Sequence, residues 1–184
     1  MTAPGPSRFT PLRSAFAIVI AAAALLVPAT AMAQKDDSYP AIGIGGNMGF
    51  QTIGSGSGLF QLGLEMPVYL SEDLSIGPWL QVGFASETVN LLFTANTRYT
   101  FDLLENTALR QVKPYLQGGF GLAHTDVNGA GSTDFVMNMG LGIEVPISER
   151  TAIASDLMFS PILTRSAGSN FTFSWQFLTL RYRF

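Results

Sequence analysis

Apolar and polar residues alternate over residues 59–70. The even-numbered positions from Phe60 to Leu70 are all apolar, whereas the odd-numbered positions from Gln61 to Tyr69 carry glutamine, glycine, glutamate, proline and tyrosine. A period of two places consecutive side chains on the two faces of a β-strand. The alternation is longer than a typical globular strand and matches the roughly 9 to 11 residues that a tilted strand needs to cross a bilayer. The pattern therefore predicts a membrane-spanning strand.

Residues 135–147 repeat this pattern, with Leu-Gly-Ile-Glu-Val-Pro-Ile in place of Leu-Gly-Leu-Glu-Met-Pro-Val. Read along the whole chain, the alternation predicts eight strands, over residues 42–50, 59–70, 74–85, 89–102, 112–123, 134–147, 151–160 and 171–184. Tight turns are expected at 71–73 and 148–150, and longer connections or loops over 51–58, 103–111, 124–133 and 161–170.

The last strand carries its apolar residues on two parities. Leu178, Leu180, Tyr182 and Phe184 share one face, but the aromatic residues at 171, 173 and 175 have the opposite parity. A β-bulge inserts one extra residue and so moves the following side chains to the other face. We therefore expect a bulge near Gln176 that turns both apolar sets outward.

Composition decides which side of the sheet meets water. The chain is 47% hydrophobic and only 12% charged, against about a quarter charged in a typical soluble domain. A soluble lipid-binding barrel would also alternate, but its outer face would be rich in Lys and Glu. An open sheet in lipid would leave edge groups unpaired at several kcal/mol each. The predicted fold is thus all-β, an eight-stranded antiparallel up-and-down transmembrane β-barrel.

The N-terminal region predicts export. Arg8 and Arg13 precede an apolar run from Ala15 to Val27, and Ala31-Met32-Ala33 has the small-x-small form of a cleavage site. The run is too short for a membrane anchor, which needs about 20 residues. We expect residues 1–33 to be a cleaved signal peptide and residues 34–184 to form the barrel.

Charge and residue usage exclude several functions. The chain has no cysteine, so disulfides and thiol chemistry are excluded, and a single histidine argues against a transition-metal site. The net charge of −3 does not suit a nucleic-acid-binding protein, which needs a basic patch. No cofactor is predicted.

Two motifs resemble a known family. Lys113-Pro114-Tyr115-Leu116, with glycines at 119 and 121, follows a strand that contains Arg98-Tyr99, and the chain ends in Leu178-x-Leu180-x-Tyr182-x-Phe184. In these features the mature chain resembles the outer membrane protein β-barrel domain family of Gram-negative bacteria. The resemblance implies that the terminal motif is an assembly signal read by the barrel-assembly machinery. It also implies a cell outer membrane location, periplasmic chaperones as transient partners and lipopolysaccharide as a permanent neighbour.

Charged residues on the inward parity are the candidate site. An eight-stranded barrel is just wide enough for side chains to fill, and buried charges must pair. The sequence therefore predicts an ion-paired plug made of Glu65, Arg98, Glu144, Asp156, Arg181 and Arg183. Acid/base catalysis by the two glutamates is the alternative, but it needs a substrate-sized cavity.

Other residues are assigned to the rims. His124, near Asp126 and Ser132, is placed at an extracellular loop edge, where a His/Ser pair would suit a lipid A-modifying acyl hydrolase. Two aromatic girdles are expected, one periplasmic (Tyr39, Tyr99, Phe101, Tyr182 and Phe184) and one external (Phe50, Phe60, Phe84, Phe135 and Phe159). Short connections are expected on the periplasmic side and long ones outside, which places the regions of Gln51, Glu87, His124 and Arg165 outside the cell.

The function expected from these features is non-enzymatic. We expect a structural or surface-interaction protein whose extracellular loops carry any specificity. The alternatives are a narrow porin-like channel or carrier for small solutes, and the acyl hydrolase. The sequence leaves the ligand, the host partner and the oligomeric state open.

Overall fold

The computed structural model describes residues 39–54, 56, 58–103, 109, 111–164 and 171–184. The predicted signal peptide over residues 1–33 lies outside these residues, as do most of the connection predicted over 103–111 and the region of Arg165.

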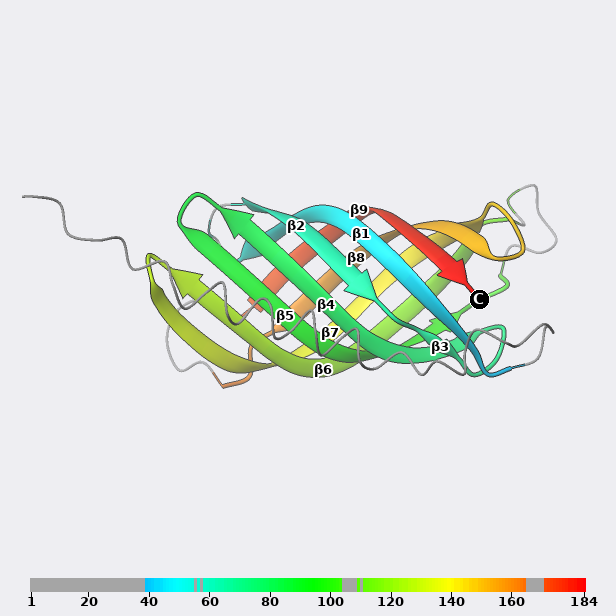
Figure 1. The fold of residues 1–184 in the computed structure, drawn as a ribbon, viewed down its shortest axis with the longest axis horizontal. Helices are drawn as coiled ribbons and strands as arrows, with labels where there is room; N and C mark the ends of the chain where they lie inside the picture. Colours follow the sequence, from blue (N-terminus) through cyan, green and yellow to red (C-terminus); the bar gives the residue numbers. More distant parts are fainter. Residues whose placement is uncertain (1–38, 55, 57, 104–108, 110, 165–170) are drawn as a thin grey trace, which may run out of the picture. The chain divides into compact units, whose positions relative to one another are not determined.

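Within these residues, nine strands form one antiparallel sheet that closes on itself (Figure 1). The strands are β1 (Ala41–Ile53), β2 (Gly58–Glu65), β3 (Val68–Tyr69), β4 (Leu74–Ala85), β5 (Thr88–Thr100), β6 (Lys113–Val127), β7 (Ala130–Pro146), β8 (Thr151–Pro161) and β9 (Phe171–Arg183). β2 and β3 both lie between β1 and β4, the later strands pair with their neighbours in sequence, and the first strand pairs with the last along Gly43 to Ile53. The predicted barrel is confirmed. No helix in the described part of the chain is long and apolar enough to cross a membrane.

The strand predicted over residues 59–70 is interrupted, and this part of the prediction is wrong. β2 ends at Glu65 and β3 begins at Val68, because Pro67 has no N–H group to donate to the sheet. Pro78 on the neighbouring β4 also lacks this donor, although the amide of Met66 still donates to its carbonyl at 3.1 Å. The pairing register with β1 and with β4 is the same on both sides of the gap. β2 and β3 are therefore two halves of one strand, and the barrel has eight.

Side chains separate onto the two faces as the alternation predicts. Along β2 and β9, outward Leu62 and Leu180 are 45% and 52% exposed, whereas inward Gln61 and Thr179 are 0% and 1% exposed. The outer surface is apolar and the interior is largely polar, with glutamine, asparagine, serine and threonine among its most buried residues. This arrangement is the reverse of a soluble protein and fits a barrel surrounded by lipid.

The two rims of the barrel differ in the connections that they carry. We call the rim where β1 begins and β9 ends the terminal end; it carries the connections at 70–73, 101–112 and 147–150. The opposite rim, the distal end, carries the connections at 54–57, 86–87, 128–129 and 162–170. Short and long connections occur at both ends. The expectation that the short ones gather at the terminal end is therefore wrong.

The loop predicted over residues 124–133 is instead a tight turn. β6 continues to Val127 and β7 begins at Ala130, so only Asn128 and Gly129 connect them. Their φ angles are 54° and 81°, and two positive φ values in succession favour the Asn-Gly pair of a two-residue hairpin. Both strands continue here with polar residues, so the alternation of apolar residues ends before the strands do.

The predicted bulge in the last strand is confirmed. Phe177 and Leu178 both face outward, and the pairing of β9 shifts register against β1 and against β8 at this level. Gln176 and Phe177 of β9 together lie opposite Gly49 of β1. The shift lets Trp175 and Leu180, which differ in parity, both face lipid.

Aromatic side chains cluster at both rims. At the distal end, Phe60 lies between Phe50 and Phe84, with ring centroids 6.1 and 5.5 Å away. At the terminal end, Tyr99 contacts Phe101 at 5.0 Å, and Tyr182 contacts Phe184 at 5.3 Å. Tyr39 does not belong to this girdle. Its hydroxyl contacts Arg183 and its side chain lines the mouth of the barrel.

Candidate functional site

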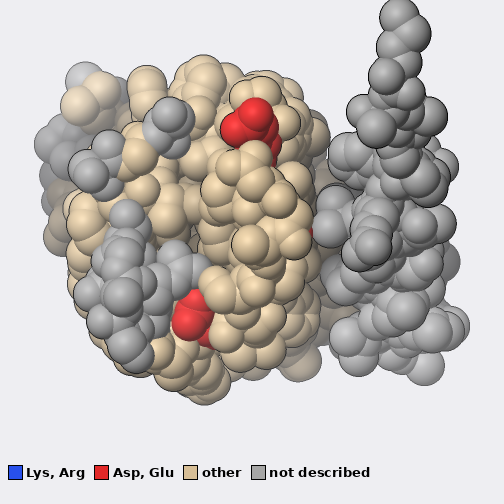
Figure 2. Space-filling view, turned by 90° about the vertical axis from the view of Figure 1, so that its left-hand side faces the viewer, with Lys and Arg blue, Asp and Glu red and all other residues tan. Residues whose placement is uncertain are grey.

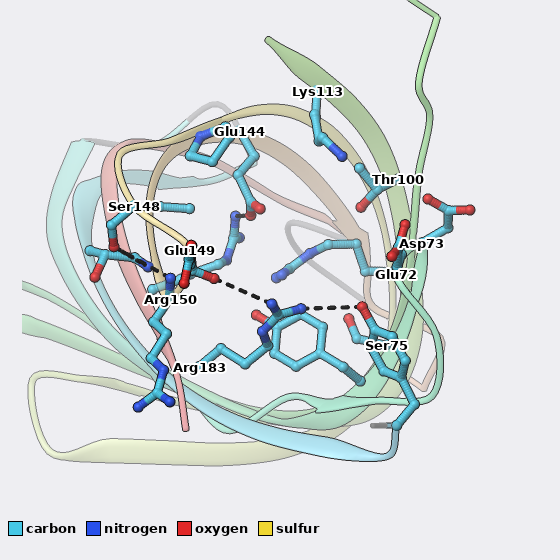
Figure 3. Close-up of a pocket in the computed structure, with 17 residues that line it drawn as sticks. Glu72, Asp73, Ser75, Thr100, Lys113, Glu144, Ser148, Glu149, Arg150 and Arg183 are labelled. Carbon is cyan, nitrogen blue, oxygen red and sulfur yellow. Dashed lines mark hydrogen bonds and ion pairs between the residues drawn. The ribbon is translucent and has the colours of Figure 1, made fainter. Parts of the chain in front are cut away.

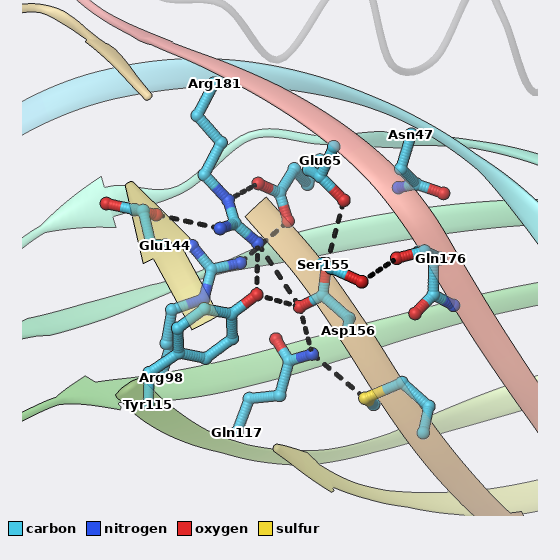
Figure 4. Close-up of polar contacts among 12 residues, drawn as sticks. Asn47, Glu65, Arg98, Tyr115, Gln117, Glu144, Ser155, Asp156, Gln176 and Arg181 are labelled. Atoms are coloured by element: carbon cyan, nitrogen blue, oxygen red, sulfur yellow. Dashed lines mark hydrogen bonds and ion pairs between the residues drawn. The ribbon is translucent and has the colours of Figure 1, made fainter. Parts of the chain in front are cut away.

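Five of the six predicted interior charges meet inside the barrel near the terminal end (Figure 4). We call them the charge cluster; its members are Glu65 of β2, Arg98 of β5, Glu144 of β7, Asp156 of β8 and Arg181 of β9. Each sits on the inward parity of its strand. The cluster therefore joins strands from all around the barrel wall.

Gly45 of β1 makes room for the central ion pair of the cluster. It lies opposite Glu65 on one side and opposite Arg181 on the other. A Cβ atom on Gly45 would lie 2.6 Å from Oε1 of Glu65. Because β1 carries no side chain at this level, the carboxylate and the guanidinium meet across it.

Arg181 is the centre of the cluster. Its Nε donates to Glu65 Oε1 at 2.5 Å and its Nη1 donates to Glu144 Oε2 at 2.8 Å. Its Nη2 reaches Asp156 Oδ1 at 3.5 Å. The side chain is 2% exposed, so these carboxylates replace the water that a guanidinium normally contacts. The cluster thus sets three carboxylates against two guanidiniums, that of Arg181 and a second one.

That second guanidinium belongs to Arg98. Its Nη2 donates to Glu65 Oε2 at 2.8 Å, so both oxygens of Glu65 are engaged by arginines. The guanidinium carbons of Arg98 and Arg181 lie 5.0 and 5.1 Å from the ring centroid of Tyr115, within cation–π range. Both cations thus contact the phenol ring.

A second glycine shapes the other half of the cluster. Gly142 of β7 lies between Tyr115 and Asp156, and a Cβ there would overlap the phenol group. The Tyr115 hydroxyl donates to Asp156 Oδ1. Gln117 donates to the same oxygen at 3.0 Å and Thr179 to Oδ2 at 2.9 Å. Sequence reasoning named none of these three partners as site residues, although their inward parity was the available signal.

Arg183, the sixth predicted charge, does not join the cluster. It lies two residues further along β9 than Arg181, and so nearer the rim. Its Nη1 donates to the Tyr39 hydroxyl and its Nη2 to the carbonyl of Glu149, both at 3.2 Å. There it borders a cavity of about 330 Å³ that opens at the terminal end (Figure 3). Arg98, Glu144 and Arg181 also line this cavity. We call it the vestibule.

Beyond the charge cluster, toward the distal end, the interior holds uncharged polar residues. Asn138 donates to Thr94 at 2.9 Å and to Asn96 at 3.2 Å, and Thr125 donates to Asn90 at 3.0 Å. These hydrogen bonds link β5, β6 and β7 across the inner wall. The polar layer is buried, with Thr94 1% exposed.

A small apolar cluster lies among the polar residues toward the distal end. Leu92, Ala123 and Val136 form a buried cluster with exposures of 1%, 1% and 0%. Ile162, which pairs with Val136, is 5% exposed. The interior is thus ionic near the terminal end and mixes polar with apolar residues toward the distal end, where Asn90 and Thr125 lie nearer the rim than Leu92 and Ala123.

His124 lies within β6 and not on a loop, which corrects its predicted position. Its Nδ1 contacts Thr133 Oγ1, the residue opposite it on β7, at 2.9 Å. Ser132 occupies the other face of the hairpin, and its hydroxyl donates to Asp134 at 3.3 Å. Neighbouring residues of a strand point to opposite faces, so the structure does not bring His124 and Ser132 together.

The described residues hold no group of three or more His, Asp or Glu side chains suited to a metal ion. The carboxylates of the charge cluster are directed at arginines, an arrangement that stabilises them as ion pairs. The chemistry that the geometry supports is therefore charge neutralisation across the barrel interior.

The fold is shared with a number of solved structures. Neisserial surface protein A is 16% identical, with a TM-score of 0.62, and the match covers 80% of this chain and 98% of that one. The N-terminal β-barrel domain of Pseudomonas aeruginosa OprF is 15% identical, with a TM-score of 0.56 and coverages of 77% and 97%. Ail, the attachment invasion locus protein of Yersinia pestis, is 14% identical, with a TM-score of 0.50 and coverages of 78% and 97%.

At these identities the likeness concerns the fold alone. A comparison with curated protein sequences gives no match. The family model described as the outer membrane protein β-barrel domain matches residues 19–184, which is most of the chain. The closed antiparallel barrel, its apolar outer face and this match agree, and the chain belongs to the outer membrane protein β-barrel domain family.

Proposed function

We propose that this protein is a non-enzymatic outer-membrane barrel with a closed interior, which serves a structural or surface-interaction role. The observation that supports the proposal best is the charge cluster around Arg181, 2% exposed, with three carboxylates directed at it. A guanidinium held in this way occupies the interior of the barrel and links its strands through ion pairs. It leaves the outer surface and the rims for contact with other molecules.

The proposed location is the cell outer membrane, reached through export by the signal peptide over residues 1–33. Family membership supports this location. The terminal end then faces the periplasm, where chaperones and the barrel-assembly machinery meet the chain during insertion. The distal end faces the cell exterior.

The distal end is the proposed interaction surface. Its described residues include Glu87, Asp126 and Asp134, whereas every described Lys and Arg lies in the half nearer the terminal end. Figure 2 looks onto the distal end and shows isolated acidic groups without Lys or Arg. Because the turns at 86–87 and 128–129 are short, we assign specificity to strand ends and hairpin tips. Lipopolysaccharide phosphates next to these acids would be bridged by divalent cations.

Two measurements on the purified barrel test the closed interior and the absence of catalysis. In planar lipid bilayers we expect no unitary conductance steps, and reproducible steps would favour the narrow channel instead. Incubated with lipopolysaccharide, the protein should release no fatty acid. Release that is lost in His124→Ala would contradict the proposal and support the acyl hydrolase.

Charge-reversal substitutions at the distal end test the proposed interaction surface. Glu87→Lys combined with Asp126→Lys reverses the described charge of the distal end, and we expect a severalfold change in the binding of cells to host surfaces or to cationic ligands. Glu72→Lys combined with Asp73→Lys makes the same change of charge at the terminal end and is the matched control. An equal response from both pairs would contradict the assignment of the surface.

A further inference from the structure

A small cavity lies inside the barrel wall, beside the charge cluster. Its volume is about 20 Å³, and its lining includes Pro67, Gly77 and Pro78. The two prolines have no N–H group to donate to the sheet and Gly77 has no side chain, so fewer atoms fill the space beside them. A cavity of about 10–15 Å³ is enough for one water molecule.

Three unpartnered polar atoms belong to residues that line this cavity. They are Nε1 of Trp79, Nε of Arg98 and Oε1 of Gln117, each buried and without a hydrogen-bond partner among the described residues. Trp79 is 2% exposed and Arg98 is 7% exposed. Buried polar atoms in native proteins almost always have a partner, which is often an ordered water.

The orientation of the Gln117 amide is fixed by its other contacts. Its Nε2 donates to Asp156 Oδ1 at 3.0 Å, and a carboxylate oxygen accepts only from the NH₂ side of an amide (Figure 4). The carbonyl oxygen of Gln117 is therefore the atom left for the cavity. The site offers two N–H donors, from an indole and a guanidinium, and one carbonyl acceptor.

We propose that this cavity is a binding site for a single structural water molecule. A water molecule accepts two hydrogen bonds and donates two, so it can accept from Trp79 and Arg98 and donate to Gln117. Its second hydrogen is directed toward Asn96, which also lines the cavity. The bound water connects the charge cluster to β4, a strand that contributes no residue to it.

A neutral ligand fits the site better than an ion. Glu65 lines the cavity, and its carboxylate disfavours an anion. The guanidinium of Arg98 and the two N–H donors disfavour a cation. The cavity lies next to the vestibule, because Ser75 and Arg98 line both cavities.

Nuclear magnetic resonance of the refolded barrel in deuterated detergent tests the site. The chain has two tryptophans, so two indole N–H signals are expected. The indole of Trp79 should show a cross-peak to water with the sign of a long-lived molecule. Trp175 is the internal control, because its indole donates to Ser155 at 3.2 Å on the outer surface and should show no such peak.

Three results would overturn the proposal. The first is no cross-peak at Trp79 in the wild-type barrel, which would mean a dry cavity. The second is loss of the peak in Ser75→Ala, which would mean exchange relayed by the serine hydroxyl. The third is a bromide ion located beside Trp79 by anomalous scattering in soaked crystals, which would mean a halide site.

Two variants refine the test. Gln117→Leu removes the acceptor, and we expect the Trp79 cross-peak to weaken severalfold or disappear while the Trp175 signal keeps its position. Trp79→Phe identifies the indole signal. Heat-modifiable migration on gels verifies that each variant is folded, and an unchanged peak in folded Gln117→Leu would contradict the proposed geometry.

Discussion

Arg181 donates to Glu65 at 2.5 Å across 116 positions of sequence, and the two residues lie on the strands that flank β1 on either side. β1 and β9 are the first and last strands, so this ion pair spans the line along which the barrel closes. Both side chains are at most 5% exposed. The pair therefore links closure of the sheet to the charge balance of the interior.

Removal of Arg181 should be costly. Arg181→Met leaves Glu65 and Asp156 buried and Glu144 half-buried with one guanidinium between them, and breaking a buried ion pair costs about 3–5 kcal/mol. We expect this loss in the free energy of unfolding, measured by urea titration of the barrel in lipid vesicles. Arg183→Met is the control and should cost at most about 1 kcal/mol, because its contacts are at the rim. Equal losses for the two variants would contradict the central role of Arg181.

Two glycines on β1 and β7 should respond in opposite ways to the same substitution. Gly142→Ala places a methyl group against the Tyr115 ring and should destabilise the barrel by about 1–3 kcal/mol, as overpacking does. Gly46 faces outward, and a Cβ there meets nothing within 4 Å. Gly46→Ala should be neutral or stabilise by up to about 1 kcal/mol, because alanine restricts the unfolded chain. Urea titration measures both, and a destabilising Gly46→Ala would contradict the described surface.

The outer face should reject charge. Leu62 is 45% exposed in the middle of the β1–β2 pairing and meets lipid in a membrane-spanning barrel. Leu62→Arg should cost about 2–4 kcal/mol, the value for Arg near the bilayer midplane. Leu103→Arg, at a terminal-end position that is 73% exposed, should change the unfolding free energy by less than about 0.5 kcal/mol. If Leu62→Arg were equally mild, the surface would face water.

The absence of cysteine makes a labelling test of orientation free of background. Glu87 at the distal end and Glu72 at the terminal end are both exposed and lie in connections between strands. In intact cells, a membrane-impermeant maleimide should label Glu87→Cys. Glu72→Cys should react only after the outer membrane is permeabilised. The opposite result would reverse the proposed orientation.

The terminal aromatic residue should matter more for assembly than for stability. Phe184 packs on Tyr182, and its amide donates to the carbonyl of Ile42 at 2.9 Å, a bond that a side-chain substitution retains. Phe184→Ala should lower the amount of folded protein in the outer membrane severalfold, with at most about 1 kcal/mol lost in vesicles. Phe171→Ala, which removes a ring at the other end of β9, is the control. A normal level of folded Phe184→Ala in cells would contradict the assembly signal.

The sequence predicted the number of barrel strands and the face of most side chains, because the period of two depends only on residues along one strand. The interruption of the strand at Pro67 depends on how two strands pair. Pro67 and Pro78 lie on adjacent rungs of the β3–β4 region, and neither strand alone reveals this register. The Asn-Gly pair at Asn128 indicates a tight turn, but the strand ends beside it are polar and lack the apolar alternation.

The sequence predicted which charged residues lie in the candidate site but not which of them contact one another. Inward parity identifies Glu65, Arg98 and Arg181 as interior charges, but their contacts cross the barrel between strands far apart in sequence. Which carboxylate meets which arginine depends on the stagger of the strands around the axis. Arg183 shares the parity of Arg181 and yet lies at the rim, because depth along the axis is a second coordinate that alternation does not supply.

The bulge at Gln176 and Phe177 also determines how β9 aligns with β1. A regular β9 could slide by two residues along β1 and still present apolar groups to lipid, but the extra residue fits only where Gly49 lies opposite it. Sliding would place the backbone of Trp175 against a residue that carries a side chain. The pairing of β9 with β1 thus has one admissible alignment.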